Sequence, residues 1–90
     1  LGESPNLSVY NLSDIPGKGL LLSRQLESAG ARVEVVDSKY EGESITGSGC
    51  VFRSRSEYVY TEYILEKFIK CKELPEKNNK KGEGIEIWLL

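Results

Sequence analysis

Residues 7–37 constrain the fold most, because they switch between strand-like and helix-like patterns at clear boundaries. Alternating apolar residues predict a strand over 7–12. The segment "SDIPGKGLLLSRQLESAG" follows and predicts a short helix, with capping residues and a proline at its start, leucines one turn apart and a final glycine. The valine-rich residues 32–37 predict a second strand. This order is typical of a β-α-β unit.

The second half of the chain repeats this order with weaker signals. Residues 45–53 predict a strand that two glycines loosen, and a Ser-x-x-Glu capping box spans 54–57. A helical stripe follows, formed by Tyr60, Ile64, Phe68 and Cys71. The polar run "EKNNKKGEG" predicts a loop, and alternating apolar residues predict a last strand over 85–90.

The whole order is therefore β-α-β-β-α-β. With right-handed crossovers, it predicts an α+β, ferredoxin-like sandwich, in which both helices cover one face of a four-stranded antiparallel sheet. Ninety residues are enough for one core, so we expect a single domain over 1–90. Within it, residues 1–6 and the loop 74–83 are the segments expected to be flexible.

Composition limits the functions open to the chain. The net charge is −2, which argues against a broad phosphate-binding surface, and no apolar window reaches the roughly 18 residues of a membrane span. Histidine is absent and there are two cysteines, so we expect no metal and no cofactor. Buried, unpaired thiols at Cys50 and Cys71 are the favoured interpretation, which implies an intracellular and cytoplasmic protein.

The turn "DIPGKG" before the first helix has two interpretations. Free N–H groups at a helix start attract a carboxylate or phosphate, glycines admit a ligand to the backbone, and a lysine adds charge. Alternatively, the turn is only a tight connection with an exposed lysine. The candidate ligand-binding residues are Asp14, Pro16, Gly17, Lys18 and Gly19.

The same region resembles the opening half of an ACT domain. The resemblance covers residues 7–37 and is carried by Asp14-Ile15-Pro16-Gly17, Leu26, Ala29-Gly30 and Val33. It implies a regulatory module with the β-α-β-β-α-β order, which pairs through its sheet and binds an amino acid near the glycine turn. Asp14, Pro16 and Gly17 would then contact the ligand, and Gly30 would have a structural role.

The sheet face away from the helices is the second candidate site. If the strands alternate as expected, this face presents an apolar patch of Tyr10, Leu12, Val36, Phe52 and Trp88, together with Cys50. Such a patch indicates a homodimer or another protein partner. The segments "LSVYNL" and "TGSGCVF" also resemble the two strand motifs of an RNA-recognition motif, which stacks bases on aromatic side chains. The corresponding stacking positions here are Ser8, Ser48 and Cys50, none of which is aromatic, so Tyr10 and Phe52 would have to substitute for them.

Catalysis has less support. Without histidine, acid–base chemistry falls to carboxylates, lysine, tyrosine or cysteine, and no paired constellation stands out. Three glutamates of the second helix, Glu57, Glu62 and Glu66, are most simply a solvated face. We therefore expect a non-catalytic binding or regulatory domain that takes a small anionic ligand at the glycine turn. The alternative is a protein- or RNA-binding module that uses the sheet.

Overall fold

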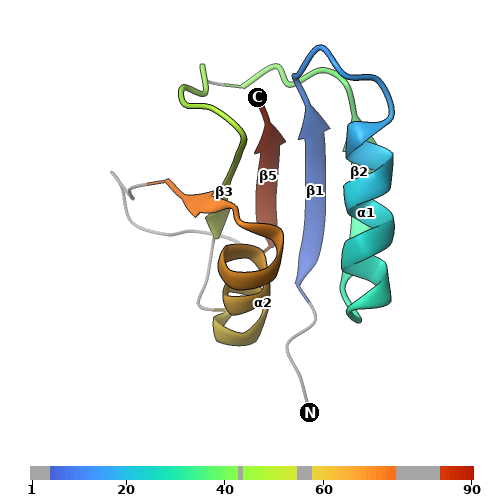
Figure 1. The fold of residues 1–90 in the computed structure, drawn as a ribbon, viewed down its shortest axis with the longest axis vertical. Coiled ribbons are helices and arrows are strands. Elements are labelled where there is room, and N and C mark those ends of the chain that lie inside the picture. Colours follow the sequence, from blue (N-terminus) through green and yellow to red (C-terminus); the bar gives the residue numbers. More distant parts are fainter. Residues whose placement is uncertain (1–4, 43, 55–57, 75–83) are drawn as a thin grey trace.

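The computed structural model describes residues 5–42, 44–54, 58–74 and 84–90, and within these ranges the chain has an α+β fold (Figure 1). The expected flexible segments 1–6 and 74–83, and the capping box at 54–57, lie largely outside the described residues. The elements in chain order are β1 (Asn6–Asn11), α1 (Lys18–Ser28), β2 (Arg32–Asp37), β3 (Cys50–Ser54), α2 (Val59–Ile64), the π-helical turn η1 (Leu65–Ile69), β4 (Lys72–Glu73) and β5 (Ile85–Leu89).

The sheet is mixed, with five strands in the order β2-β1-β5-β3-β4. Strand β1 runs parallel to both β2 and β5, whereas β3 runs antiparallel to β5 and parallel to β4. The expectation of four antiparallel strands is therefore wrong, although the α+β class is confirmed. The arrangement consists of two β-α-β units. In the first, β1 and β2 are adjacent and parallel, and in the second, β3 and β4 are; β5 lies between the two units and pairs with β1 and β3.

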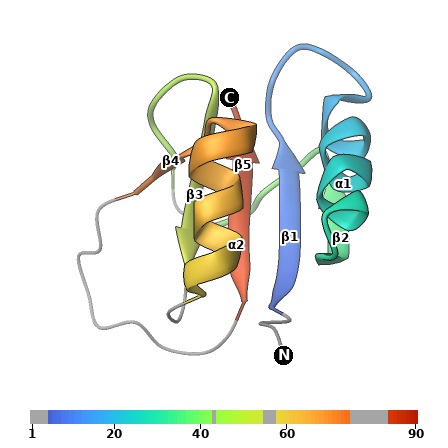
Figure 2. The ribbon, with the colours of Figure 1, turned by 60° about the horizontal axis from the view of Figure 1, so that its bottom comes forward.

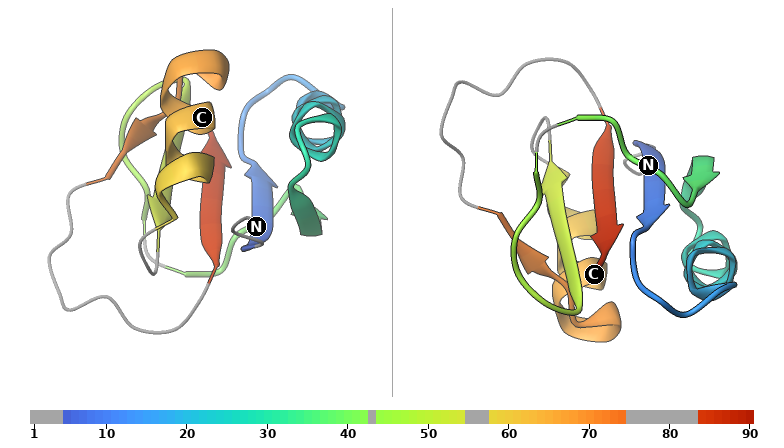
Figure 3. Two further views of the ribbon diagram at one scale, coloured as in Figure 1. Left: turned by 90° about the horizontal axis from the view of Figure 1, so that it is seen from below. Right: turned by 90° about the horizontal axis from the view of Figure 1, so that it is seen from above.

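Both helices lie on the same face of the sheet, as expected (Figures 2 and 3). Because β3 runs opposite to β1, and β2 and β4 lie at opposite edges, right-handed crossovers carry both helices over the same side. The start of α1 and the orange end of the second helical segment also lie toward one end of the sheet, where β5 ends (Figure 2).

The core lies between this helical layer and the central strands. Its members are Leu7, Val9, Leu22, Leu26, Phe52, Leu65, Cys71, Ile85, Ile87 and Leu89. The inward side of the second helical segment is shifted from the expected stripe. Leu65 is fully buried, whereas Tyr60 and Phe68 are mostly exposed. The inward positions Thr61, Leu65 and Ile69 keep a regular spacing of four residues, so the inward stripe lies one residue later than the expected one throughout α2 and η1.

The third strand is inverted relative to the sequence expectation. Phe52 was expected on the open face, but it pairs with Ile87 and lies in the core, with no exposed surface. Its neighbour Val51 pairs instead with Trp88 on the opposite side. A one-residue shift in a strand exchanges its two faces, and the irregular segment before β3 gave no anchor for the alternation. Cys50 shares the helical face with Phe52.

Trp88 is on the open face as expected, but the patch around it is not an open surface. Its ring has no exposed surface, because Tyr10 stacks on it at a centroid distance of 6.4 Å and Tyr40 packs edge-on at 5.3 Å. The guanidinium of Arg53 lies 5.4 Å from the ring centroid. Tyr40 belongs to the connection between β2 and β3, so the chain covers its own indole. The expected exposure of Trp88 is wrong.

Val36, like Phe52 and Cys50, lies on the opposite face from the one expected. The pairing of β1 with β2 shifts between Leu7 and Ser8, which aligns Val33 with Leu7 and Val36 with Val9. Since Leu7 and Val9 face the helices, Val36 also lies on the helical side, close to Gly19 of α1. It remains 45% exposed at the edge of the sheet. A bulge of this kind leaves no mark in a valine-rich strand.

Candidate functional site

The glycine turn connects β1 to α1 at the carboxyl end of β1. Gly17 is the residue before the helix and has a left-handed backbone with φ of 81°, where a side chain would be strained. Gly19 is buried against the sheet, and a Cβ there would lie 3.2 Å from the Cβ of Asn11. Each glycine thus has a structural reason, which supports the interpretation of the segment as a tight turn.

The side chain of Asn11 holds this turn in shape. Its Nδ2 donates a hydrogen bond to the carbonyl of Ile15 at 2.9 Å, and its Oδ1 accepts from the backbone N–H of Ser13 at 3.1 Å and from the Ser13 hydroxyl. These hydrogen bonds fix the loop that precedes α1, and Lys18 follows this loop in the first turn of the helix. No acidic residue occupies that first turn and no side chain caps it, so the positive end of the helix has no nearby compensating carboxylate in the turn.

Two hollows contain three of the five candidate ligand-binding residues. Asp14 and Pro16 line a shallow, open depression of about 360 Å³. Lys18 lines a different groove of about 370 Å³. Gly17 and Gly19 line neither. The depression contains a carboxylate, whereas the groove contains a lysine, so the groove suits an anion better.

The groove lies between the start of α1 and the end of η1, above the carboxyl end of β5. We refer to it as the α1–η1 groove, and it is lined by Lys18, Leu21, Leu22, Gln25, Gly49, Cys50, Ile69, Lys70 and Leu89. None of these described lining residues is acidic. Two lysines from distant parts of the sequence thus meet at an otherwise largely apolar groove.

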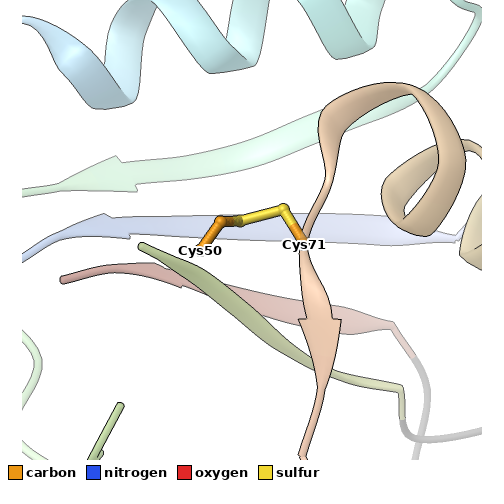
Figure 4. Close-up of a disulfide and its surroundings, with 2 residues drawn as sticks. All are labelled: Cys50 and Cys71. Atoms are coloured by element: carbon orange, nitrogen blue, oxygen red, sulfur yellow. A yellow bond between two sulfur atoms is a disulfide. The ribbon is translucent and has the colours of Figure 1, made fainter. Parts of the chain in front are cut away.

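One wall of this groove is held by a disulfide bond between Cys50 and Cys71 (Figure 4). The bond joins the start of β3 to the residue that follows Lys70, with a Cα–Cα distance of 4.6 Å. The expectation of unpaired thiols is therefore wrong, and the argument from those thiols for a reducing compartment no longer holds. Two cysteines on neighbouring elements can pair once the fold brings them together, which a reading of their local sequence does not reveal.

Lys70 is the functional candidate that the sequence did not indicate. It ends η1 with a left-handed backbone, φ 69°, and it is the only described residue other than glycine with a positive φ. That conformation turns the chain back toward β3, so that Cys71 reaches Cys50. The feature that draws attention to Lys70 is its left-handed backbone, which glycine adopts far more readily than lysine. This feature is visible only in the structure.

Comparison of the chain with protein-family models, curated proteins and solved structures finds no match in any of the three. Among the described residues, neither helix has the length and apolar character needed to cross a bilayer.

Proposed function

We propose that this chain is a non-catalytic binding domain that takes a small anionic ligand, such as an amino acid, beside the β1–α1 turn. Support comes first from position. The turn follows the carboxyl end of β1, which is flanked by the parallel strands β2 and β5. In sheets of parallel strands, the crevice outside the carboxyl ends of the strands is where ligands are commonly bound. The first turn of α1 adds a positive helix end to this crevice.

The observation that carries the proposal is Lys18. This residue is half-buried in the first turn of α1 and lines the α1–η1 groove, whose described lining has no carboxylate. A ligand carboxylate in the groove would meet the ammonium of Lys18 and the N-terminal end of α1 together, and these attractions add. The resemblance to ACT domains also points to this turn, but the geometry supports the site without it.

The alternative function, protein or RNA binding through the open face of the sheet, has less exposed aromatic surface than the sequence led us to expect. Phe52 and Trp88 have no exposed surface, so neither ring is available for stacking on a base or packing against a partner. Tyr10 is half-buried as a member of the same aromatic cluster, and Leu12 is 37% exposed. The geometry therefore favours ligand binding at the turn over association through the open face.

Heteronuclear NMR titration of the whole chain with acetate, glycine and phosphate tests this function. We expect amide shifts concentrated over residues 18–25 and 69–70, which line the α1–η1 groove, and weaker binding in Lys18→Ala. Lys39→Ala is the matched control, because Lys39 is an exposed lysine outside the groove. If none of the anions shifts these amides, or if both variants bind as the unmodified chain does, the proposal is wrong.

A further inference from the structure

We infer that the ligand of the α1–η1 groove is an amphipathic anion, a single carboxylate carried on a short apolar chain. The inference rests on the proposed function, because it concerns the same site, and it adds the chemical class of the ligand. It starts from the lining of the groove, in which two lysines accompany four aliphatic side chains: Leu21, Leu22, Ile69 and Leu89. A purely polar anion would use the lysines and leave the aliphatic surface without a partner.

The charge of the groove selects the headgroup. Lys18 approaches from the start of α1 and Lys70 from the end of η1, and no acidic side chain among the described lining residues opposes them. Two lysines that line one groove attract an anion and repel a cation. Lys70 is exposed and Lys18 is half-buried, so both side chains are accessible from solvent.

The apolar surface of the groove selects the tail. Leu22 and Leu89 are buried in the fold, whereas Leu21 is 60% exposed on the wall of α1. The groove volume of about 370 Å³ is near the lower end of the range of roughly 300–1,000 Å³ that is usual for small-molecule sites. A short single chain is therefore a better match than a large lipid. Each methylene that it buries strengthens binding by about four-fold.

Binding of a series of ligands to the whole chain, followed by NMR, separates this inference from the proposed function. The probes are octanoate, acetate, octanol and octylammonium. If half of its additional methylenes are buried, octanoate binds on the order of fifty-fold more tightly than acetate, and it shifts the amides of Leu21, Leu22, Ile69 and Lys70. Octanol and octylammonium, which lack the negative headgroup, bind more weakly than octanoate.

Paired variants test the two halves of the groove. Leu21→Gln weakens octanoate binding by a larger factor than acetate binding, whereas Leu20→Gln changes neither, because Leu20 is a comparably exposed neighbour outside the groove. Lys70→Ala weakens octanoate binding by roughly two- to five-fold, as expected for loss of one exposed charge pair. Lys67→Ala, within η1 but outside the groove, has no effect.

The outcomes are distinguishable. If acetate binds at the turn as tightly as octanoate, the proposed function stands and the amphipathic class is overturned. Octanol or octylammonium binding as tightly as octanoate overturns the role of the two lysines. If no probe shifts residues 18–25 or 69–70, both the function and the ligand class fail.

Discussion

Reduction of the Cys50–Cys71 disulfide should remove a large share of the stability of this domain. The bond closes a loop with a sequence separation of 21 residues. The loop-closure relation gives an entropy of about 11 cal/mol/K for a loop of this size, so the oxidised chain should gain roughly 3.3 kcal/mol at 25 °C. A domain of 90 residues has a total free energy of unfolding on the order of 5–13 kcal/mol. Loss of this crosslink would therefore remove about a quarter or more of the free energy of unfolding.

Urea denaturation of the oxidised and reduced chains measures this loss. Trp88 is the single tryptophan and is fully buried, so its emission reports unfolding in both states. We expect a lower midpoint after reduction, and also a steeper dependence on urea, because the unfolded chain without the crosslink exposes more surface. The double variant Cys50→Ala/Cys71→Ala should be less stable than the oxidised chain and should not respond to reductant.

Two results would refute this reasoning. One is a pair of denaturation curves that superimpose with and without reductant. The other is the detection of two free thiols when the unreduced chain is unfolded and titrated with a thiol reagent. Either result would mean that the crosslink does not constrain the chain, and that the wall of the α1–η1 groove is held only by packing.

Three substitutions test the packing and the backbone. Leu65→Ala should lower the free energy of unfolding by about 2–5 kcal/mol in urea denaturation, because the fully buried Leu65 anchors η1 to the core. Gly19→Ala should cost about 1–3 kcal/mol in the same assay, since the new Cβ would lie 3.2 Å from Asn11 and 3.5 Å from Val36; a neutral result would contradict the close packing of α1 on the sheet. Lys70→Gly should raise the thermal midpoint, because glycine relieves a left-handed backbone that costs other residues roughly 1–2 kcal/mol, and should still weaken anion binding; a loss of stability would contradict this account of Lys70.

The sequence was sufficient to predict most of the individual elements of the fold. Residues 7–37 have strong local signals, and β1, α1 and β2 lie within a few residues of their predicted positions. Helix α1 ends at Ser28, and Gly30 follows with the expected left-handed backbone. The two-residue strand β4 was missed, because Lys72 and Glu73 have no apolar alternation.

The arrangement of the strands could not be predicted, because pairing is decided by contacts between distant segments. A β-α-β crossover fixes that β1 and β2 are parallel, but it does not say whether another strand lies between them. In this fold they are adjacent, and β5 pairs on the other side of β1. The faces assigned to Phe52 and Val36 failed for a related reason. Strand alternation gives two solutions, and only the pairing with β5 and the bulge beside Leu7 select one of them.

The candidate site was half predictable for the same physical reason. Lys18 is marked by a local motif, so it could be selected from the sequence, but its partner in the groove depends on topology. Because β5 lies between the two β-α-β units, its carboxyl end separates the start of α1 from the end of η1, and Leu89 becomes part of the groove. The two helical segments run in opposite directions along the sheet, so a helix start and a helix end meet there (Figure 2). A lysine is favourable at a helix end, where it compensates the negative carbonyl groups, and Lys70 therefore adds a second positive charge to the groove without conflicting with its own element. Each β-α-β unit could be recognised separately from the sequence. The groove forms only where β5 brings the two units together, and neither unit contains it alone.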